Sequence, residues 1–287
     1  MIKEELVIEL MAKWGNFKAT CKSNFAKTEM AKKNKELQDK YKNERCFILG
    51  NAKSNREQNL GLLEDEIVIV TNEFFKYENY QDAKPDYYVI VDPAYFKETT
   101  GEQLLSQIDK IKEYEHKPVF IVPDSAKKII SERYKWDEWT EVYYLHAGLR
   151  FTADYSKVWD IAKPIPFPQS VIQVAILLAT FMGVKEIYLL GVEETGILDM
   201  LNAYFDKAPE NYVYEDKTGN KPYIEVIKSR PIEEWLRGFS IIFQHYREVY
   251  DYCKRRGVEV FNCTPETLVT SIPYKNLESV LECDKMK

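Results

Sequence analysis

The clearest signal of the fold is the sequence Arg45-Cys46-Phe47-Ile48-Leu49-Gly50-Asn51. A short apolar run that ends in glycine and asparagine is typical of a strand that is buried on both faces and leads into a loop. Because Gly50 can adopt a positive φ and lets a ligand approach the backbone closely, this loop is a candidate for binding the phosphate-sugar end of a nucleotide. The stretch therefore predicts an α/β protein with a binding loop after its first strand.

Further apolar runs follow, each ending in small or polar residues. They are Glu66–Val70 before Thr71-Asn72, Tyr87–Val91 before Asp92-Pro93, Pro118–Val122 before Pro123-Asp124, and Glu186–Leu190 before Gly191-Val192-Glu193. Helical composition marks the segments 101–115, Ser170–Met182 and Phe239–Arg256, and Val258–Phe261 is the last expected strand. This series predicts a Rossmann-like, doubly wound, mostly parallel sheet.

The chain divides by pattern into four segments. We expect an N-terminal helical arm over 1–44, a Rossmann-like nucleotide-binding domain over 45–193, a lid insertion over 194–237, and a C-terminal helix and strand over 238–287 that complete the sheet. Through Arg45 the chain has eleven Lys and Arg against seven Asp and Glu, a net +4, although the whole chain has a net charge of −6. The arm is interpreted either as a solvated packing helix or as a peripheral contact with an acidic membrane surface or a partner.

Composition excludes several classes of protein. With 40 basic against 46 acidic residues, a nucleic-acid partner is not expected. The five cysteines include no C-x-x-C pair, which speaks against a disulfide framework or a zinc site. No run approaches the roughly 18 apolar residues of a membrane helix, and no signal-peptide pattern is present. We therefore expect a cytoplasmic protein, peripheral to the inner face of the membrane if the arm binds lipid, with its oligomeric state open.

In an open α/β sheet the ligand binds beyond the carboxyl ends of the strands. The candidates at that edge are Gly50, Asn51, Lys53, Ser54, Asn72, Asp92 and Gly191 for binding and Glu193 for binding or catalysis. The side chains of Asn51, Ser54 and Asn72 can donate hydrogen bonds to phosphate, ribose or carboxylate oxygens. Those of Asp92 and Glu193 can accept them from ribose hydroxyls or hold a metal. Each residue alone is an ordinary turn former, so the prediction depends on several sharing one edge.

Several known motifs are missing. There is no G-x-G-x-x-G and no G-x-x-x-x-G-K-[ST], which makes a dinucleotide-dependent dehydrogenase or a P-loop kinase unlikely on sequence grounds. There is no G-x-S-x-G elbow of an α/β-hydrolase. No two of the three histidines have metal-ligand spacing, so no metal site is expected. Among the histidines, His245 is the candidate general base, although an ordinary helix histidine is the competing interpretation.

Several stretches also resemble a known family. Lys42–Asn51, Asn72–Phe75 and Lys84–Pro93 resemble the DUF115 family, which includes archaeal 6-hydroxymethylpterin diphosphokinase (MptE-like) proteins and many polysaccharide-locus proteins. They are also similar to the bacterial family 42 sialyltransferases, and Gly183–Glu193 and Gly257–Pro265 match both groups. The resemblance covers most of 40–282, except 194–235, and implies a Rossmann-like nucleotide-binding domain with a lid.

The resemblance also implies site residues. In the sialyltransferases the donor is a CMP-sugar, and its binding carries over to Gly50, Asn51, Asn72 and Ser170. The usual G-N-G-P-S-L loop is replaced here by Gly50-Asn51-Ala52-Lys53-Ser54-Asn55, in which Lys53 adds a charge that can meet a phosphate. The lid lacks the histidine that the sialyltransferases use. A different base would be Tyr212, Tyr214, Tyr223 or an acid such as Glu193; otherwise the activity differs or is lost.

Three functions follow from the resemblance. The first is a glycosyltransferase of surface-polysaccharide biosynthesis that moves a sugar from a nucleotide-sugar donor, such as a CMP-sugar, to a glycan acceptor without a metal cofactor. The second is an MptE-like diphosphokinase, which would transfer pyrophosphate from ATP, require Mg²⁺ and use charges such as Lys53 and Arg56. The third is a nucleotide-binding protein without catalysis, which the altered loop and the missing lid histidine favour.

Overall fold

A seven-stranded parallel sheet forms the centre of the computed structural model, which describes residues 2–96, 101–151, 159–207 and 223–282. The strand order is β5-β4-β3-β2-β1-β8-β9. The strands are β1 Arg45–Leu49, β2 Ile67–Thr71, β3 Tyr87–Val89, β4 Val119–Pro123, β5 Val142–Leu145, β8 Glu186–Leu190 and β9 Glu259–Asn262. Every neighbouring pair is parallel, which confirms the predicted α/β fold.

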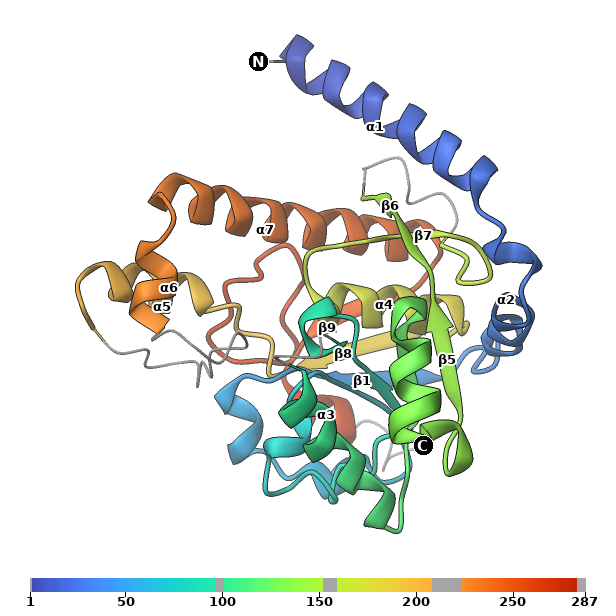
Figure 1. Ribbon diagram of the computed structural model, residues 1–287. Helices are drawn as coiled ribbons and strands as arrows, with labels where there is room; N and C mark the ends of the chain where they lie inside the picture. Colours follow the sequence, from blue (N-terminus) through green and yellow to red (C-terminus); the bar gives the residue numbers. More distant parts are fainter. Residues whose placement is uncertain (1, 97–100, 152–158, 208–222, 283–287) are drawn as a thin grey trace.

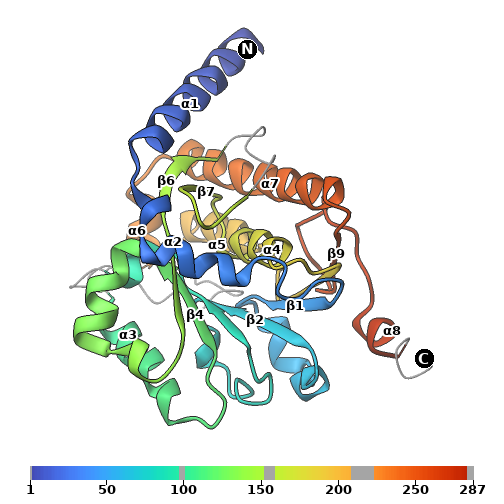
Figure 2. The ribbon, with the colours of Figure 1, turned by 90° about the vertical axis from the view of Figure 1, so that its right-hand side faces the viewer.

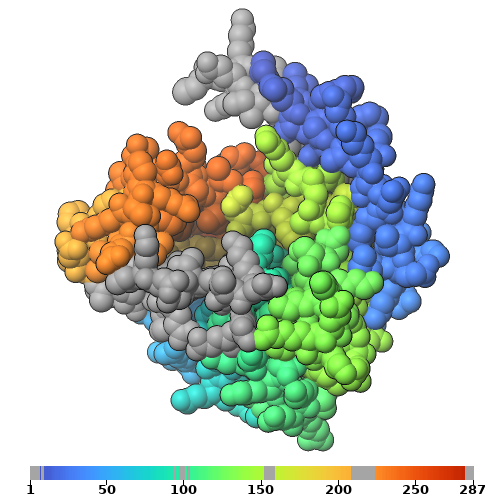
Figure 3. Space-filling model, viewed as in Figure 1, coloured from blue at the N-terminus to red at the C-terminus, as the bar shows by residue number. Residues whose placement is uncertain are grey.

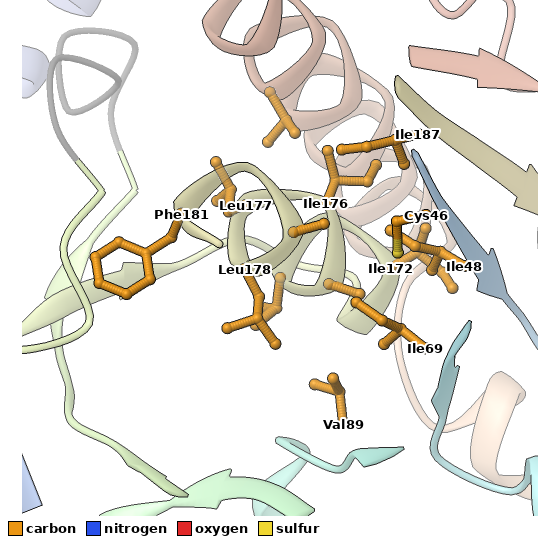
Figure 4. Close-up of a cluster of buried hydrophobic side chains, with 14 of the residues drawn as sticks. Cys46, Ile48, Ile69, Val89, Ile172, Ile176, Leu177, Leu178, Phe181 and Ile187 are labelled. Atoms are coloured by element: carbon orange, nitrogen blue, oxygen red, sulfur yellow. The ribbon is translucent and has the colours of Figure 1, made fainter. Parts of the chain in front are cut away.

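Successive strand residues point to opposite sides of the sheet, and the residues on both sides are buried. Cys46 and Ile48 of β1 belong to the core beneath α4 (Val171–Phe181) and α7 (Ile232–Arg255), whereas Phe47 belongs to the core on the other face. Figure 4 shows side chains of α4 beside Cys46 and Ile48. Helices therefore cover both faces (Figures 1 and 2), and the near-continuous apolar strands of the sequence are explained.

The order of the sheet reverses direction between β1 and β8. From β1 the chain adds β2, β3, β4 and β5 outward on one side, and it then returns to place β8 and β9 on the other side of β1. The loops after β1 and β8 leave their strands in opposite directions at this point, which is where ligands bind in open α/β sheets.

The N-terminal arm consists of two helices, α1 (Ile2–Lys22) and α2 (Glu29–Asn34), where the sequence predicted continuous helix. The break is explained by Thr28, whose side chain accepts a hydrogen bond from the backbone N–H of Ala31 and so begins a new helix. The amide of Asn34 donates to the carbonyls of Tyr144 and Ile161, which seats α2 over the edge strand β5.

Several elements were not predicted. They are β5, the two-stranded sheet of β6 (Ala147–Arg150) and β7 (Ile165–Phe167), and the helices α5 (Gly196–Tyr204), α6 (Tyr223–Lys228) and α8 (Leu277–Glu282). The helix predicted over 101–115 is α3 (Glu102–Ile108) followed by a 3-10 turn, Asp109–Glu113. None of the described helices has the length and apolarity needed to cross a bilayer.

The segment predicted as a lid, 194–237, is only partly described. Residues 208–222 lie outside the described part of the chain, so the lid stays a prediction. The described part is helical, and α7 begins seven residues before the predicted Phe239, at Ile232. Met200 and Ala203 of α5 pack against Ile227 of α6 in a small separate core.

Candidate functional site

Gly50 and Gly191 meet where β1 and β8 end. The backbone N–H of Gly50 donates to the carbonyl of Leu190 at 2.8 Å, and that of Ala52 donates to the carbonyl of Gly191 at 3.2 Å. A Cβ on Gly50 would lie 2.3 Å from the Gly191 carbonyl oxygen, and Gly191 itself has a φ of +65°. Neither position accepts a side chain, so the two glycines bring the two loops together at the reversal of the sheet.

Hydrogen bonds from side-chain amide and hydroxyl groups hold the loop after β1 in place. The Asn55 side-chain amide donates to the carbonyl of Gly50 at 2.7 Å, and the backbone carbonyl of Asn55 accepts from the side-chain amide of Asn79 at 3.3 Å. The Tyr77 hydroxyl donates to the carbonyl of Ala52 at 3.0 Å. No role was predicted for these three side chains, because they lie up to 29 residues from Gly50 and no local pattern links them.

Five buried side-chain oxygens at this edge have no hydrogen-bond partner among the described residues. They are Asn51 Oδ1, Ser54 Oγ, Asn55 Oδ1, Asn72 Oδ1 and Glu193 Oε2. They come from the loops after β1, β2 and β8, which are neighbours in the sheet. Since buried polar atoms in native proteins are nearly always paired, this group is a candidate for contact with a ligand or with ordered water. The sequence predicted donors here, whereas the open atoms are mainly acceptors, which suit hydroxyl and amino groups.

Glu193 links the loops after β1 and β8. Its side chain is 7% exposed, and its Oε1 accepts a hydrogen bond from the backbone N–H of Ser54 at 3.2 Å. The loop after β9 holds this segment, because the Thr264 hydroxyl accepts from the N–H of Val192 at 2.9 Å and the N–H of Leu268 donates to the Glu193 carbonyl at 2.9 Å. Glu193 therefore presents Oε2 from a fixed backbone.

Ser170 and Glu194 form a second cluster with Tyr246. The Tyr246 hydroxyl donates to Glu194 Oε1 at 2.5 Å, and the Ser170 hydroxyl lies 3.3 Å from the same oxygen. Burial raises the pKa of the Glu194 carboxyl above its ordinary value, and hydrogen bonds from Tyr246 and Ser170 oppose that rise. Ser170 also caps α4 in a capping box with Gln173, which gives it a structural role. The predicted contact of Ser170 with the nucleotide-sugar stays a prediction.

His245 lies on α7. Its described contacts are with Gln169 and Phe151, not with the loop after β1. Its Nδ1 accepts from the backbone N–H of Gln169 at 3.3 Å, and its ring centroid is 4.4 Å from that of Phe151. Burial lowers the pKa of His245 to about 4, so the ring is neutral at pH 7. These contacts indicate a packing role, and its role as a base stays a prediction.

The remaining predicted residues take up different positions at this edge. Asn72 follows β2 with a φ of 44°, and its carbonyl accepts from the Tyr88 hydroxyl at 2.6 Å. The carbonyl of Asp92 accepts from the N–H of Tyr95 at 3.2 Å in a turn after β3. Lys53 is exposed at the start of a 3-10 turn.

Two of the alternative bases, Tyr212 and Tyr214, lie outside the described residues. Tyr223 begins α6, and its side chain is not among those described. In the part of the chain that the structure covers, no group of three or more His, Cys, Asp or Glu side chains is placed to hold a metal ion.

A comparison with protein-family models found no match, and a comparison with curated proteins found no significant match. The resemblance to the DUF115 family is therefore not confirmed. Among solved structures, the MAf glycosyltransferase from Magnetospirillum magneticum AMB-1 is similar with a TM-score of 0.49 and 12% identity, over 92% of this chain. This chain spans only 41% of that protein.

The sialyltransferase CstII from Campylobacter jejuni, solved with the substrate analogue cytidine-5'-monophosphate, is similar with a TM-score of 0.44 and 14% identity. That match covers 80% of this chain and 84% of the other. A second structure of this sialyltransferase, with a trisaccharide acceptor and CMP, gives a TM-score of 0.43 at 14% identity, over 80% and 85% of the two chains. All three TM-scores lie below 0.5, so no functional conclusion is drawn from them.

Proposed function

We propose that this chain is a glycosyltransferase that binds the nucleotide of an activated sugar where β1 and β8 separate. The observation that carries the proposal is the group of five unpartnered buried oxygens around Gly50 and Gly191. A nucleoside has hydroxyl groups on its ribose and, in cytosine, adenine and guanine, an exocyclic amino group. These donors match the oxygens of Asn51 and Asn72, and Glu193 Oε2 is left for the hydroxyl of the sugar acceptor.

Glycosyl transfer suits this site for a second reason. Transfer needs the donor and acceptor held in a fixed geometry, and a group that takes the proton from the acceptor hydroxyl while the nucleotide phosphate leaves. Glu193 offers one carboxylate oxygen already fixed by the N–H of Ser54 and a second, Oε2, that is open. We assign the proton acceptor to Glu193 rather than to His245, whose Nδ1 already accepts a hydrogen bond.

The sequence resemblance favours a CMP-sugar as the donor and a glycan as the acceptor. We assign Asn51 and Asn72 to the nucleoside and the exposed Lys53 to its phosphate. Synthesis of a surface polysaccharide is the process that this resemblance favours.

The test is a set of turnover assays on the full chain. CMP-, UDP- and GDP-sugars are incubated with a panel of oligosaccharide acceptors, and the released nucleotide and the extended glycan are followed by chromatography. We expect release from one nucleotide class that increases when an acceptor is present. A parallel assay offers ATP, Mg²⁺ and 6-hydroxymethylpterin. Formation of AMP there, with no turnover of any sugar nucleotide, would overturn the proposal in favour of a diphosphokinase, and tight binding without turnover would assign a non-catalytic role.

A further inference from the structure

The outward face of α1 is apolar. Leu10, Met11, Trp14 and Phe17 are 55%, 69%, 59% and 62% exposed, and Val7, one turn before Leu10 and Met11, is 53% exposed. Their spacing of three and four residues puts them on one face of the helix. The rings of Trp14 and Phe17 stack with their centroids 6.0 Å apart. A continuous set of large apolar side chains in water indicates a surface that binds something.

The opposite face of the helix holds α1 on the body of the protein. Ala12 and Asn16 are buried there, and the Asn16 amide both donates to the carbonyl of Arg150 and accepts from its N–H, each at 2.8 Å. Figures 1 and 2 show that the rest of α1 projects away from the sheet domain, and Figure 3 shows it at the edge of the molecule. The contact with Arg150 therefore fixes which face of α1 points outward.

The second half of α1 and the residues that follow it up to Thr28 carry only positive charges. From Leu10 to Thr28 the chain has four lysines and no acidic residue, whereas the first turns of α1 carry Glu4, Glu5 and Glu9. Lys18 and Lys22 are exposed, and the Lys18 ammonium lies 5.0 Å from the centroid of the Trp14 ring. Lysines thus border the apolar face.

From this arrangement we infer that α1 docks on an anionic lipid surface. Trp14, Phe17, Leu10 and Met11 enter the boundary between headgroups and acyl chains, and Lys18 and Lys22 lie at the lipid phosphates. A second copy of the chain is the alternative occupant of this face, and the experiment below distinguishes it from a lipid surface. The inference does not rest on the proposed function.

Vesicle co-sedimentation of the full chain tests this inference. The vesicles are phosphatidylcholine alone or phosphatidylcholine with a third of phosphatidylglycerol, and each is used at low and high salt. We expect the chain to pellet with the anionic vesicles, and binding to fall as salt screens the lysines. We expect the double variant Trp14→Ala/Phe17→Ala to bind at least tenfold more weakly. Phe205→Ala, which removes an aromatic side chain that is 74% exposed in another part of the protein, is the control and is expected to bind as the unaltered chain does.

Circular dichroism of the variants checks that each is folded, and sedimentation velocity without lipid measures self-association. The inference is overturned if the unaltered chain stays in the supernatant with anionic vesicles, or if the double variant pellets equally well. Concentration-dependent dimers that disappear in the double variant, without lipid binding, would assign the face to a second copy of the chain.

Discussion

Glu193 Oε1 accepts a hydrogen bond from the backbone N–H of Ser54 at 3.2 Å, which ties the loop after β8 to the loop after β1. The two residues are far apart in the chain and meet because β1 and β8 are adjacent parallel strands with Leu49 opposite Leu190. The second oxygen of the carboxylate is buried and has no hydrogen-bond partner among the described residues. The proposed chemistry depends on this oxygen.

Replacing Glu193 by glutamine tests its role as the proton acceptor. The amide oxygen can still accept from Ser54, so we expect the folded structure to remain while kcat falls by about a hundredfold or more. Donor affinity, measured by calorimetry, is expected to change little. Glu64→Gln, which alters an exposed glutamate paired with Lys84, serves as the control. A higher KM for the donor with an unaltered kcat would instead place Glu193 against the ribose.

Replacing Gly50 by alanine tests the close approach of the two loops. The added Cβ would lie 2.3 Å from the Gly191 carbonyl oxygen, so we expect unfolding free energy to fall by about 1–3 kcal/mol. Urea unfolding measures this loss. Gly15→Ala is the matched control, because nothing lies within 4 Å of a Cβ there and alanine is the better helix former. Equal stability of the two variants would show that the loops can separate at no cost.

Replacing Asn51 by alanine separates ligand binding from stability. Its Oδ1 is buried without a partner among the described residues, so its removal is expected to leave the unfolding free energy of the free protein nearly unchanged. Nucleotide affinity should fall by about 1–2 kcal/mol, or roughly five- to thirtyfold in the dissociation constant. Calorimetric titration measures it, with the exposed Asn59→Ala as the control. An unaltered affinity would remove Asn51 from the site.

The buried ring of His245 predicts a pH dependence of stability. Its pKa is lowered by burial to about 4 in the folded chain, against an ordinary value of about 6.5. Between these values the unfolded chain binds more protons, so stability is fully present above pH 6.5 and declines as the pH falls toward 4. The unfolding free energy lost through this titration is at most about 3 kcal/mol.

Urea unfolding of the unaltered chain and of His245→Gln from pH 4 to pH 8 isolates this effect, since the Glu194 carboxyl is common to both. We expect the difference in unfolding free energy between them to shrink as the pH is lowered. A difference that is constant with pH would mean that the histidine titrates normally in the folded protein.

Much of the fold was predictable, because its strands are nearly continuous apolar runs. The bounds of β1 and β8 were predicted as the structure has them, since Cys46–Leu49 and Ile187–Leu190 are buried throughout. The short strand β6 escaped detection because three of its four residues are exposed and one is Gly148. A surface strand of this kind leaves no apolar pattern in the sequence.

The positions of the candidate site residues in the sheet were predictable, but their contacts were not. Gly50, Asn51, Asn72 and Glu193 could be placed at one edge because the carboxyl ends of parallel strands share it. The contact of Asn55 with the Gly50 carbonyl depends on how the chain turns after β1, and no periodicity encodes it. The pairing of Tyr246 with Glu194 joins residues 52 apart in the sequence. Such contacts follow from tertiary packing alone.

The central claim is that a nucleotide binds where β1 and β8 separate, and calorimetric titration of the full chain tests it most directly. CMP, UDP, GDP and ATP are titrated in turn, with and without Mg²⁺, into the unaltered chain and into Asn51→Ala. We expect one-to-one binding of one nucleotide, with CMP favoured, and a five- to thirtyfold weaker affinity in the variant. Absence of binding by all four nucleotides, or equal affinity in both proteins, would contradict it.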